Sequence, residues 1–191
     1  NGTLINESLP FDILINQTAN VSVSWIASPA GNHTIFAFIN PFQAFIDLNQ
    51  TNDIINRSIS VCPAPDLIIS GFPNIGATIA INISDPCHPN SNYILAMSLG
   101  TSPGIILSDG RTVPLNPDPL FFLSVFNSIV IGLQNTQGIL DSNGQASATW
   151  TIPSYAIPGI TVYFAFVSIN PALIVPQAIL GISNPVAVTI I

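Results

Sequence analysis

The sequence predicts an all-β fold, an antiparallel β-sandwich of Ig-like or jelly-roll-like type, built either as one sandwich or as two packed modules. Ile, Val and Thr supply 54 of the 191 residues, whereas Glu, Lys, Arg and Met together supply 4. β-branched side chains suit a pleated, half-buried surface, and the straight-chain residues that favour helices are almost absent. In addition, 17 Pro and 12 Gly separate short apolar runs, as is typical of sandwiches with many turns.

Three segments alternate apolar and polar residues with the period of two that marks a strand. They are 9–15, 21–25 and 79–83, and in each the apolar residues carry odd numbers. The turn sequence Asp141-Ser-Asn-Gly144 predicts a β-hairpin over 136–152, because Asn-Gly readily takes the positive φ angles of a tight turn. We expect further strands at 34–39, 43–48, 57–61, 93–99, 120–126, 145–152, 161–169 and 185–191.

The expected organisation has three parts: an alternating N-terminal strand at 1–15, a short β module at 16–66 and a β-sandwich domain at 67–191. A pattern repeated at an offset of 58 residues places 19–25 over 77–83 and 34–39 over 92–97. This echo marks two related modules or reflects the likeness of any two β-hairpins. A first module of this length is short of strands, and a sandwich that lacks a strand exposes an apolar groove and unpaired edges.

Charged side chains are scarce, and this excludes several classes of protein. The chain has 11 of them and a formal net charge of −7, with no Lys, whereas nucleic-acid binding needs Lys and Arg to neutralise phosphates. An apolar content of 48% argues against intrinsic disorder. Prolines interrupt the uncharged stretch 142–191 before it reaches the roughly 20 residues of a membrane-spanning helix. The chain begins at Asn1 without a signal peptide, which fits a mature secreted form.

The strongest motif is the Asn-X-Ser/Thr sequon for N-glycosylation. Eight of the 11 Asn up to position 82 match it, and none of the 8 later Asn does. This bias predicts a heavily glycosylated front half with an extracellular surface and covalently attached glycans as partners. The apolar residues of the alternating segments are odd-numbered, whereas Asn6, Asn16, Asn20 and Asn82 are even-numbered and are expected to point away from the core. The predicted sites are Asn1, Asn6, Asn16, Asn20, Asn32, Asn49, Asn56 and Asn82.

Cys62 and Cys87 are the two cysteines of the chain. In an exported protein a disulfide between them is the favoured interpretation, and a pair of free buried thiols is the alternative. The disulfide would close a loop worth roughly 3 kcal/mol of stability in the chain-entropy model. Its expected role is to stiffen the Pro-rich junction at 63–65, since no Cys-X-X-Cys spacing indicates redox catalysis.

The sequence offers no convincing catalytic or cofactor site, and we expect neither enzyme activity nor a cofactor. His33 and His88 lie in loop-like contexts, and no ligand spacing supports a zinc site that joins them to an Asp. A turn Ca²⁺ site is conceivable from several oxygen-bearing side chains, but caps of turns are the simpler role for such residues. These residues are Asp109, Asp118, Asp141 and Asn143.

The C-terminal two-thirds, roughly 67–191, resembles an uncharacterised secreted β domain of environmental bacteria that often forms the C-terminal module of exported proteins. The resemblance implies export and an all-β fold and brings no catalytic residue, and residues 1–66 depart from it. The runs that carry it are Tyr93-Ile-Leu-Ala-Met-Ser-Leu-Gly-Thr-Ser-Pro-Gly104, Val113-Pro-Leu-Asn116, Gly138-Ile-Leu-Asp-Ser-Asn-Gly-Gln-Ala-Ser-Ala148 and Ser183-Asn-Pro-Val-Ala-Val188.

The whole chain looks similar to subunits of extracellular filaments, of pilus or thread type, that exchange strands between copies. The expected function is therefore structural, in a homopolymer at the cell surface. The alternatives are a glycan- or surface-binding adhesin module and, less favoured, an exported hydrolase. The N-terminal segment is the expected donor strand, and the C-terminal strand 185–191 is the alternative donor. The apolar residues of the N-terminal donor are Ile5, Leu9, Phe11, Ile13 and Ile15.

Overall fold

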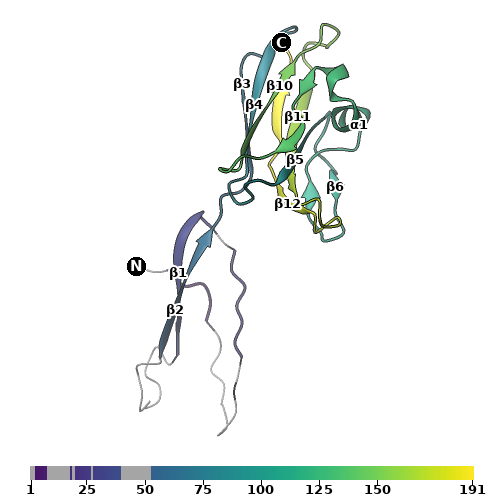
Figure 1. Cartoon of the computed structure of the whole chain (residues 1–191). Coiled ribbons are helices and arrows are strands. Elements are labelled where there is room, and N and C mark those ends of the chain that lie inside the picture. The colour runs from purple at the N-terminus through teal and green to yellow at the C-terminus, as the bar shows by residue number, and fades with distance from the viewer. Residues whose placement is uncertain (1–2, 8–17, 19, 27, 40–52) are drawn as a thin grey trace. The chain divides into compact units, whose positions relative to one another are not determined.

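The computed structural model describes residues 3–7, 18, 20–26, 28–39 and 53–191. The chain divides into two compact units, Asn1–Val61 (unit 1) and Cys62–Ile191 (unit 2). The boundary therefore falls slightly before the one expected at 66/67. Figure 1 shows the β structure of both units and the single α-helix of unit 2.

Unit 2 is an antiparallel β-sandwich, which confirms the predicted fold class. One sheet has the strand order β3-β4-β10-β8, and the other has the order β12-β11-β5-β9, with β13 also paired to β11. A two-stranded sheet of β6 and β7 adjoins them. The strands are β3 (Asp66–Ser70), β4 (Thr78–Ser84), β5 (Asn92–Ser98), β6 (Ile105–Ile106), β7 (Thr112–Val113), β8 (Leu133–Gln134), β9 (Gln137–Ile139), β10 (Gln145–Thr151), β11 (Thr161–Ile169), β12 (Ile179–Ile182) and β13 (Val186–Thr189).

The core of unit 2 lies between the two sheets. Alternate residues of the four long strands are buried there, because successive side chains of a strand point to opposite faces. Trp150 on β10 meets Phe164 on β11 edge to face, with ring centroids 5.4 Å apart, and its indole N–H donates to the Ile131 carbonyl at 2.9 Å. The inward residues are Ile79, Ile81 and Ile83 on β4, Tyr93, Leu95 and Met97 on β5, Ala148 and Trp150 on β10, and Val162, Phe164 and Phe166 on β11.

Helix α1 (Pro119–Phe126) covers the outer face of the β5–β11 sheet and is followed by the 3-10 helix η2 (Ser128–Ile131). Phe121 and Val125 of α1 pack against a small cluster of Ala96, Leu115 and Ala165. The prediction of a strand at 120–126 is therefore wrong. The Asp118 side chain accepts the Phe121 N–H at 2.9 Å as an N-cap, and Pro119 fits the first helical turn, so the segment folds as a helix.

The predicted hairpin at 136–152 is also wrong, although its turn is present. β9 pairs with β5 in one sheet, whereas β10 pairs with β4 and β8 in the other, so the turn at 141–144 carries the chain between sheets. Asp141 Oδ1 accepts the N–H groups of Asn143 and Gln145 at 2.8 Å each, and Gly144 has φ +75°. Turn chemistry is recognisable in the sequence, but the choice of partner strands depends on packing.

Of four other expected strands, one is absent, two cannot be compared with the structure and one is present. Residues 21–25 form no strand, so the echo at an offset of 58 has no counterpart in the strand pairing. The expected strands at 9–15 and 43–48 lie outside the described residues. The C-terminal strand exists as β13, which pairs with β11 of its own chain, and Ile191 exchanges backbone hydrogen bonds with Pro73 and Ile75. In this structure the alternative donor is therefore already paired within its own unit.

Candidate functional site

The described part of unit 1 contains one sheet, made of β1 (Gly31–Phe38) and β2 (Ile54–Val61). The strands are antiparallel, from Gly31 opposite Val61 to Phe38 opposite Ile54. Within the described residues each strand pairs only with the other, so each has an unpaired outer edge of eight residues. A two-stranded sheet is marginally stable alone and gains stability from a further strand or a covering surface.

The two faces of this sheet differ. Directly opposite residues of an antiparallel pair lie on the same face. One face, the sequon face, has both sequon asparagines of the sheet: it comprises Asn32, Thr34, Phe36 and Phe38 of β1 and Ile54, Asn56, Ser58 and Ser60 of β2. The other, the apolar face, comprises Gly31, His33, Ile35 and Ala37 of β1 and Ile55, Arg57, Ile59 and Val61 of β2.

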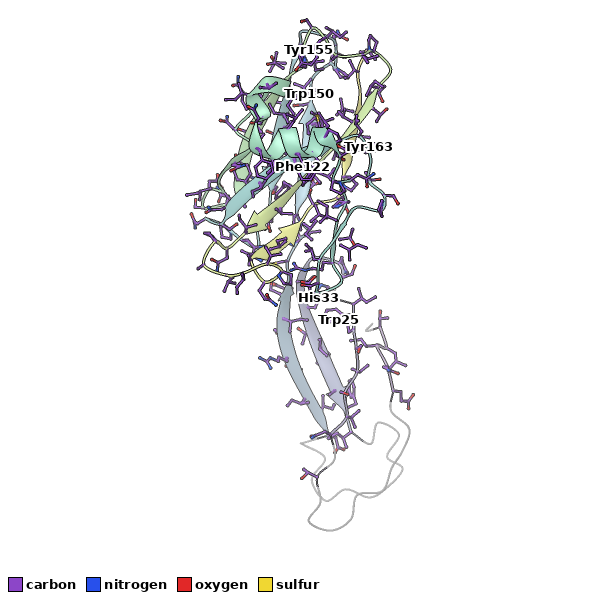
Figure 2. All side chains as sticks on the ribbon, turned by 90° about the vertical axis from the view of Figure 1, so that its right-hand side faces the viewer. Trp25, His33, Phe122, Trp150, Tyr155 and Tyr163 are labelled. Carbon is purple, nitrogen blue, oxygen red and sulfur yellow. The ribbon has the colours of Figure 1, made fainter. Side chains whose placement is uncertain are left out.

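The apolar face is covered at one end and open at the other. Trp25 meets His33 edge to face at 6.0 Å, as Figure 2 shows, and the His33 Nε2 atom lies 2.6 Å from the Pro29 carbonyl oxygen. Toward the other end a pocket of about 220 Å³ is lined by Ile35, Ala37, Ile55, Asn56 and Arg57. Ile55 is 67% exposed there. With respect to the described residues of unit 1, this open end has room for another segment.

Arg57 is the one Arg, Lys, Asp or Glu residue on the apolar face. Its side chain is exposed, and the ion pairs among the described residues do not include it. The other arginine, Arg111, is fully engaged: it contacts Asp109 and donates to the carbonyls of Ile179 and Pro176 at 2.7 and 2.9 Å.

Every sequon Asn that the structure describes is exposed. Asn82 lies on the outer face of β4 between the buried Ile81 and Ile83, which agrees with the parity expected from the sequence. Asn1, Asn16 and Asn49 lie outside the described residues. Attached sugars at the described sites would extend into solvent without disturbing the core. The exposed sites are Asn6, Asn20, Asn32, Asn56 and Asn82.

Only the start of the predicted donor strand is described. Ile5 is 41% exposed, Leu4 is exposed as well, and residues 3–7 form no strand. Leu9, Phe11, Ile13 and Ile15 lie outside the described residues. The exposed apolar side chains before residue 8 have no covering partner that the structure shows.

The two cysteines are free thiols in the structure, so it does not contain the predicted disulfide. The Cys87 thiol donates at 3.3 Å to the carbonyl of Pro63, the residue after Cys62. Burial and the neighbouring Cys62 and Asp85 side chains raise the pKa of Cys87 to about 12. The disulfide stays a prediction.

A buried polar cluster in unit 2 contains the residue types of a catalytic triad in a different order. Asp85 is fully buried, and its Oδ2 accepts from the Ser168 hydroxyl at 2.5 Å and lies 2.9 Å from His88 Nδ1. In a triad the histidine lies between the serine and the carboxylate, whereas here the carboxylate is central and Ser168 is fully buried. The cluster therefore ties β4 to β11. Asp85 Oδ1 has no hydrogen-bond partner.

The remaining carboxylates named as possible Ca²⁺ ligands are bound to backbone N–H groups. Asp109 accepts from Arg111, Asp118 from Leu99 and Phe121, and Asp141 from its own turn. Among the described residues no group of three or more His, Cys, Asp or Glu side chains could hold a metal ion. The expected turn-capping role is the one that these contacts show.

Comparison with known proteins finds no matching family model and no matching curated protein. In the part of the chain that the structure describes, no helix has the length and apolar character to cross a membrane.

The surface of α1 is a feature that the sequence analysis missed. Phe122 and Phe126 are exposed and stack with their rings 5° from parallel, and Ile129 and Val130 of η2 are exposed as well. Figure 2 shows Phe122 on the outer side of the helix. Tyr155 is also exposed, and its hydroxyl donates to the Val130 carbonyl at 2.6 Å. The Asp118-Pro119 pair was the sequence signal that could have identified the helix and hence this surface.

A wider pocket of about 450 Å³ lies beside β12 in unit 2. Arg111, Thr112, Pro114, Pro65 and residues 180–185 line it. Because Arg111 is already bound to a carboxylate and two carbonyls, the pocket presents no free charged group for catalysis. The open edges and apolar face of β1 and β2 therefore remain the stronger candidate for function.

Proposed function

We propose that the protein is a structural subunit of an extracellular, N-glycosylated filament or surface coat, which assembles head to tail by β-strand addition between copies. The observation that carries this proposal is the β1–β2 sheet of unit 1. Among the residues of unit 1 that the structure describes, it combines two unpaired eight-residue edges with an apolar face that is open at one end. Such an edge accepts an extended segment through main-chain hydrogen bonds, and side-chain pockets then select the segment.

The sheets of unit 2 have short edge strands, and side chains bond the rest of the β5 edge, which supports the choice of unit 1 as acceptor. Its long strands β4, β5, β10 and β11 lie inside the sheets, and the edge strands have two to five residues. Short edge strands resist pairing with other chains. Where β9 ends, the Ser124 hydroxyl accepts the Met97 N–H at 2.9 Å and Asp118 accepts the Leu99 N–H at 2.7 Å. Side chains of α1 and its cap thus occupy the rest of the β5 edge.

The N-terminal segment is the donor in this proposal. The apolar residues 5, 9, 11, 13 and 15 share one parity, and Asn6, Ser8, Pro10 and Asp12 share the other. The contact is heterologous and does not close on itself, so it extends into a fibre. Pro10 lacks an N–H and fits an edge position better than a central one, which makes the donor an outer strand of the combined sheet.

Glycosylation and the cysteines support the extracellular location. All described sequon Asn residues are exposed, and the Cys87 thiol lies 3.3 Å from the carbonyl of Pro63, the residue after Cys62, so a disulfide could form in an oxidising compartment. Glycopeptide mapping of native material should find sugars at most of the eight sequons and none after residue 82. Bare Asn at most of these positions would contradict the extracellular assignment.

Deletion of residues 1–15 tests the function. Negative-stain micrographs of the wild-type chain should show filaments, and the deletion should leave soluble subunits or unfolded material. Because the deletion also removes two sequons, the matched control is the double substitution Asn1→Gln and Asn6→Gln, which removes those sugars and keeps the strand. Filaments of normal morphology from the deletion would refute the N-terminal donor. A wild-type chain that stays monomeric would refute the filament itself.

The aromatic surface of α1 favours a second candidate, an adhesin module that binds glycans or a surface. Phe126 is 80% exposed and stacks on Phe122, and exposed aromatic side chains commonly contact partners. Size-exclusion chromatography separates the two candidates, since a filament subunit elutes as a polymer and an adhesin module as a monomer. The substitution Phe122→Ala should weaken surface binding only if the adhesin candidate is correct.

A further inference from the structure

We propose that Glu7 of one copy pairs with Arg57 of the next copy, and that this ion pair sets the register of the donor strand on the outer edge of β2. The proposal rests on the proposed function, because it requires strand addition between copies. It adds the acceptor strand, the residues that meet and the reason why one register is chosen over others.

Arg57 is the charged residue on the acceptor side of the proposed pair. It lies on the apolar face, opposite Ile35, and lines the open pocket together with Ile35, Ala37 and Ile55. On a donor strand beside β2, the side chains of the same face would lie directly against the guanidinium and displace water from it. A charge that loses hydration without a partner of opposite sign is destabilised, so the donor segment needs a carboxylate at this point.

Glu7 is the charged residue on the donor side. It is the one Glu of the chain, and it has the same odd parity as Ile5, Leu9, Phe11, Ile13 and Ile15. In the segment 3–15 the other charged residue, Asp12, is even-numbered and belongs to the opposite face. The donor thus carries one charge on its apolar face, as the acceptor does, and the two charges have opposite signs. Glu7 is exposed, and the ion pairs among the described residues do not include it.

Four of the five acidic residues of unit 2 are less suitable partners, and the fifth, Asp66, is exposed and serves as the charge control below. Asp85 is buried, Asp109 is paired with Arg111, and Asp118 and Asp141 accept backbone N–H groups. A partner within the donor segment is therefore the simplest source of the carboxylate.

Glycan placement agrees with the same alignment. When the odd residues of the donor join the apolar face, Asn6 joins the sequon face, which already has Asn32 and Asn56. All three sugars then lie on one side of the combined sheet and leave the other side free for packing. A slip by one residue would place the Asn6 sugar and Asp12 on the apolar face, so parity excludes it.

Parity does not exclude a slip of the donor strand by two residues, whereas the ion pair does. A slip by two residues keeps every apolar side chain on the correct face, but it moves Glu7 from Arg57 to Ile55 or Ile59, which flank Arg57 on that face of β2. Directly opposite side chains of adjacent strands are in contact, so one register alone brings the two charges together. The pair therefore distinguishes registers that the apolar pattern treats as equivalent.

Charge reversal in the full, glycosylated chain tests the pair. The variant Glu7→Arg places like charges at the joint, and so does Arg57→Glu, so each alone should lose at least tenfold in the fraction of protein that sediments as filament. Mixing the two variants should restore filaments, because the arginine that Glu7→Arg puts on the donor meets the glutamate that Arg57→Glu puts on the acceptor. The native Glu7 and Arg57 of the two variants also match. The double variant should assemble alone. The control Asp66→Arg changes the net charge of the chain as Glu7→Arg does, at an exposed position of unit 2, and should leave assembly unchanged.

Each other outcome overturns the pair. Single variants that assemble as the wild type does would show that the charges do not meet. Restoration in the double variant but not in the mixture would show that Glu7 and Arg57 pair within one copy. A mixture and a double variant that both stay unassembled would refute the pairing as well. Because the wild type assembles in the same experiment, these results are distinct from a failure of the proposed function, in which the wild type itself forms no filament.

Discussion

Replacement of Ser124 by Ala isolates the contact that attaches α1 to the sandwich. The Ser124 side chain is fully buried, and its hydroxyl oxygen accepts the Met97 N–H at 2.9 Å. The same hydroxyl lies within donating distance of the carbonyls of Phe121, at 2.7 Å, and Met97, at 3.3 Å. Met97 is almost fully buried, so water cannot replace the lost acceptor. The substitution therefore leaves a buried backbone N–H without a partner while it removes little volume.

The expected cost follows from that orphaned N–H group. A buried donor that loses its partner costs about 1–3 kcal/mol, and we take about 2 kcal/mol for this neutral contact. For a domain of the size of unit 2, each kcal/mol lowers Tm by about 3–5 °C, so Tm should fall by about 6–10 °C.

A thermal melt followed by circular dichroism measures this change, and hydrogen exchange locates it. The Met97 amide should exchange faster in the variant, whereas amides of the β3–β4 pair should keep their order of protection. The matched control is Ser147→Ala at an exposed position of β10, which should leave Tm within about 1 °C. An unchanged Tm together with unchanged Met97 exchange would refute the claim that this hydroxyl satisfies the β5 edge.

Three further predictions concern unit 2. Substitution Gly144→Ala should prevent folding or destabilise severely, because a Cβ there would collide with a backbone carbonyl, whereas Gly110→Ala, also at positive φ but with open space around it, should cost only about 1 kcal/mol in a denaturant titration. The hydrogen bond from the Arg111 guanidinium holds the pKa of Asp109 below its usual range, so the pair's contribution to stability is present above the ordinary Asp pKa and is lost only as pH falls through the lowered value. Because charged side chains are scarce, thermal melts between pH 7 and pH 3 should show that the fold is retained. Loss of the folded state in that range would contradict this prediction. In the reduced protein, Cys87 should resist alkylation at pH 8.5 because its pKa is about 12, whereas the exposed thiol of Cys62 should be modified. Peptide mass spectrometry measures the two alkylation rates, and equal rates would count against the burial of Cys87.

Local patterns in the sequence were sufficient for most of the sandwich. Alternation and β-branched content predicted β4, β5, β10 and β11 close to their observed bounds, since residues on one face of a buried strand must be apolar. The parity argument also placed Asn82 correctly on the outer face of its strand. These features depend on residues that are close together in the sequence and on the burial of one face of each strand.

Features that depend on distant partners were not predictable in this way. Residues 120–126 are apolar at every position except Ser124, on the exposed side of the helix as well as on the side that packs on the sheet. Such a run has no period that distinguishes strand from helix, and only the cap at Asp118 does. The turn at 141–144 has the chemistry of a hairpin, yet its flanking strands enter different sheets, where β9 pairs with β5 and β10 pairs with β4. Pairing is a property of the whole sandwich.

The candidate site could be predicted only in part from the sequence. The parity of Glu7 with the apolar donor residues could be taken from the sequence alone. The place of Arg57 could not, because it required the register of β1 against β2, which puts Arg57 opposite Ile35 and on the face away from both sequons.

In the proposed filament each subunit has one donor segment, and of the two edges of unit 1 that are unpaired within the described residues it uses that of β2, on which Arg57 lies, as its acceptor. In the language of polymer chemistry, such a monomer has a functionality of two, and such monomers yield linear chains and never a branched network. The chain length would then depend on the extent of reaction, so a small quantity of subunits without a donor segment would act as chain stoppers and shorten every filament in the population. A truncated copy that lacks residues 1–15 but retains β1 and β2 would be a stopper of this kind.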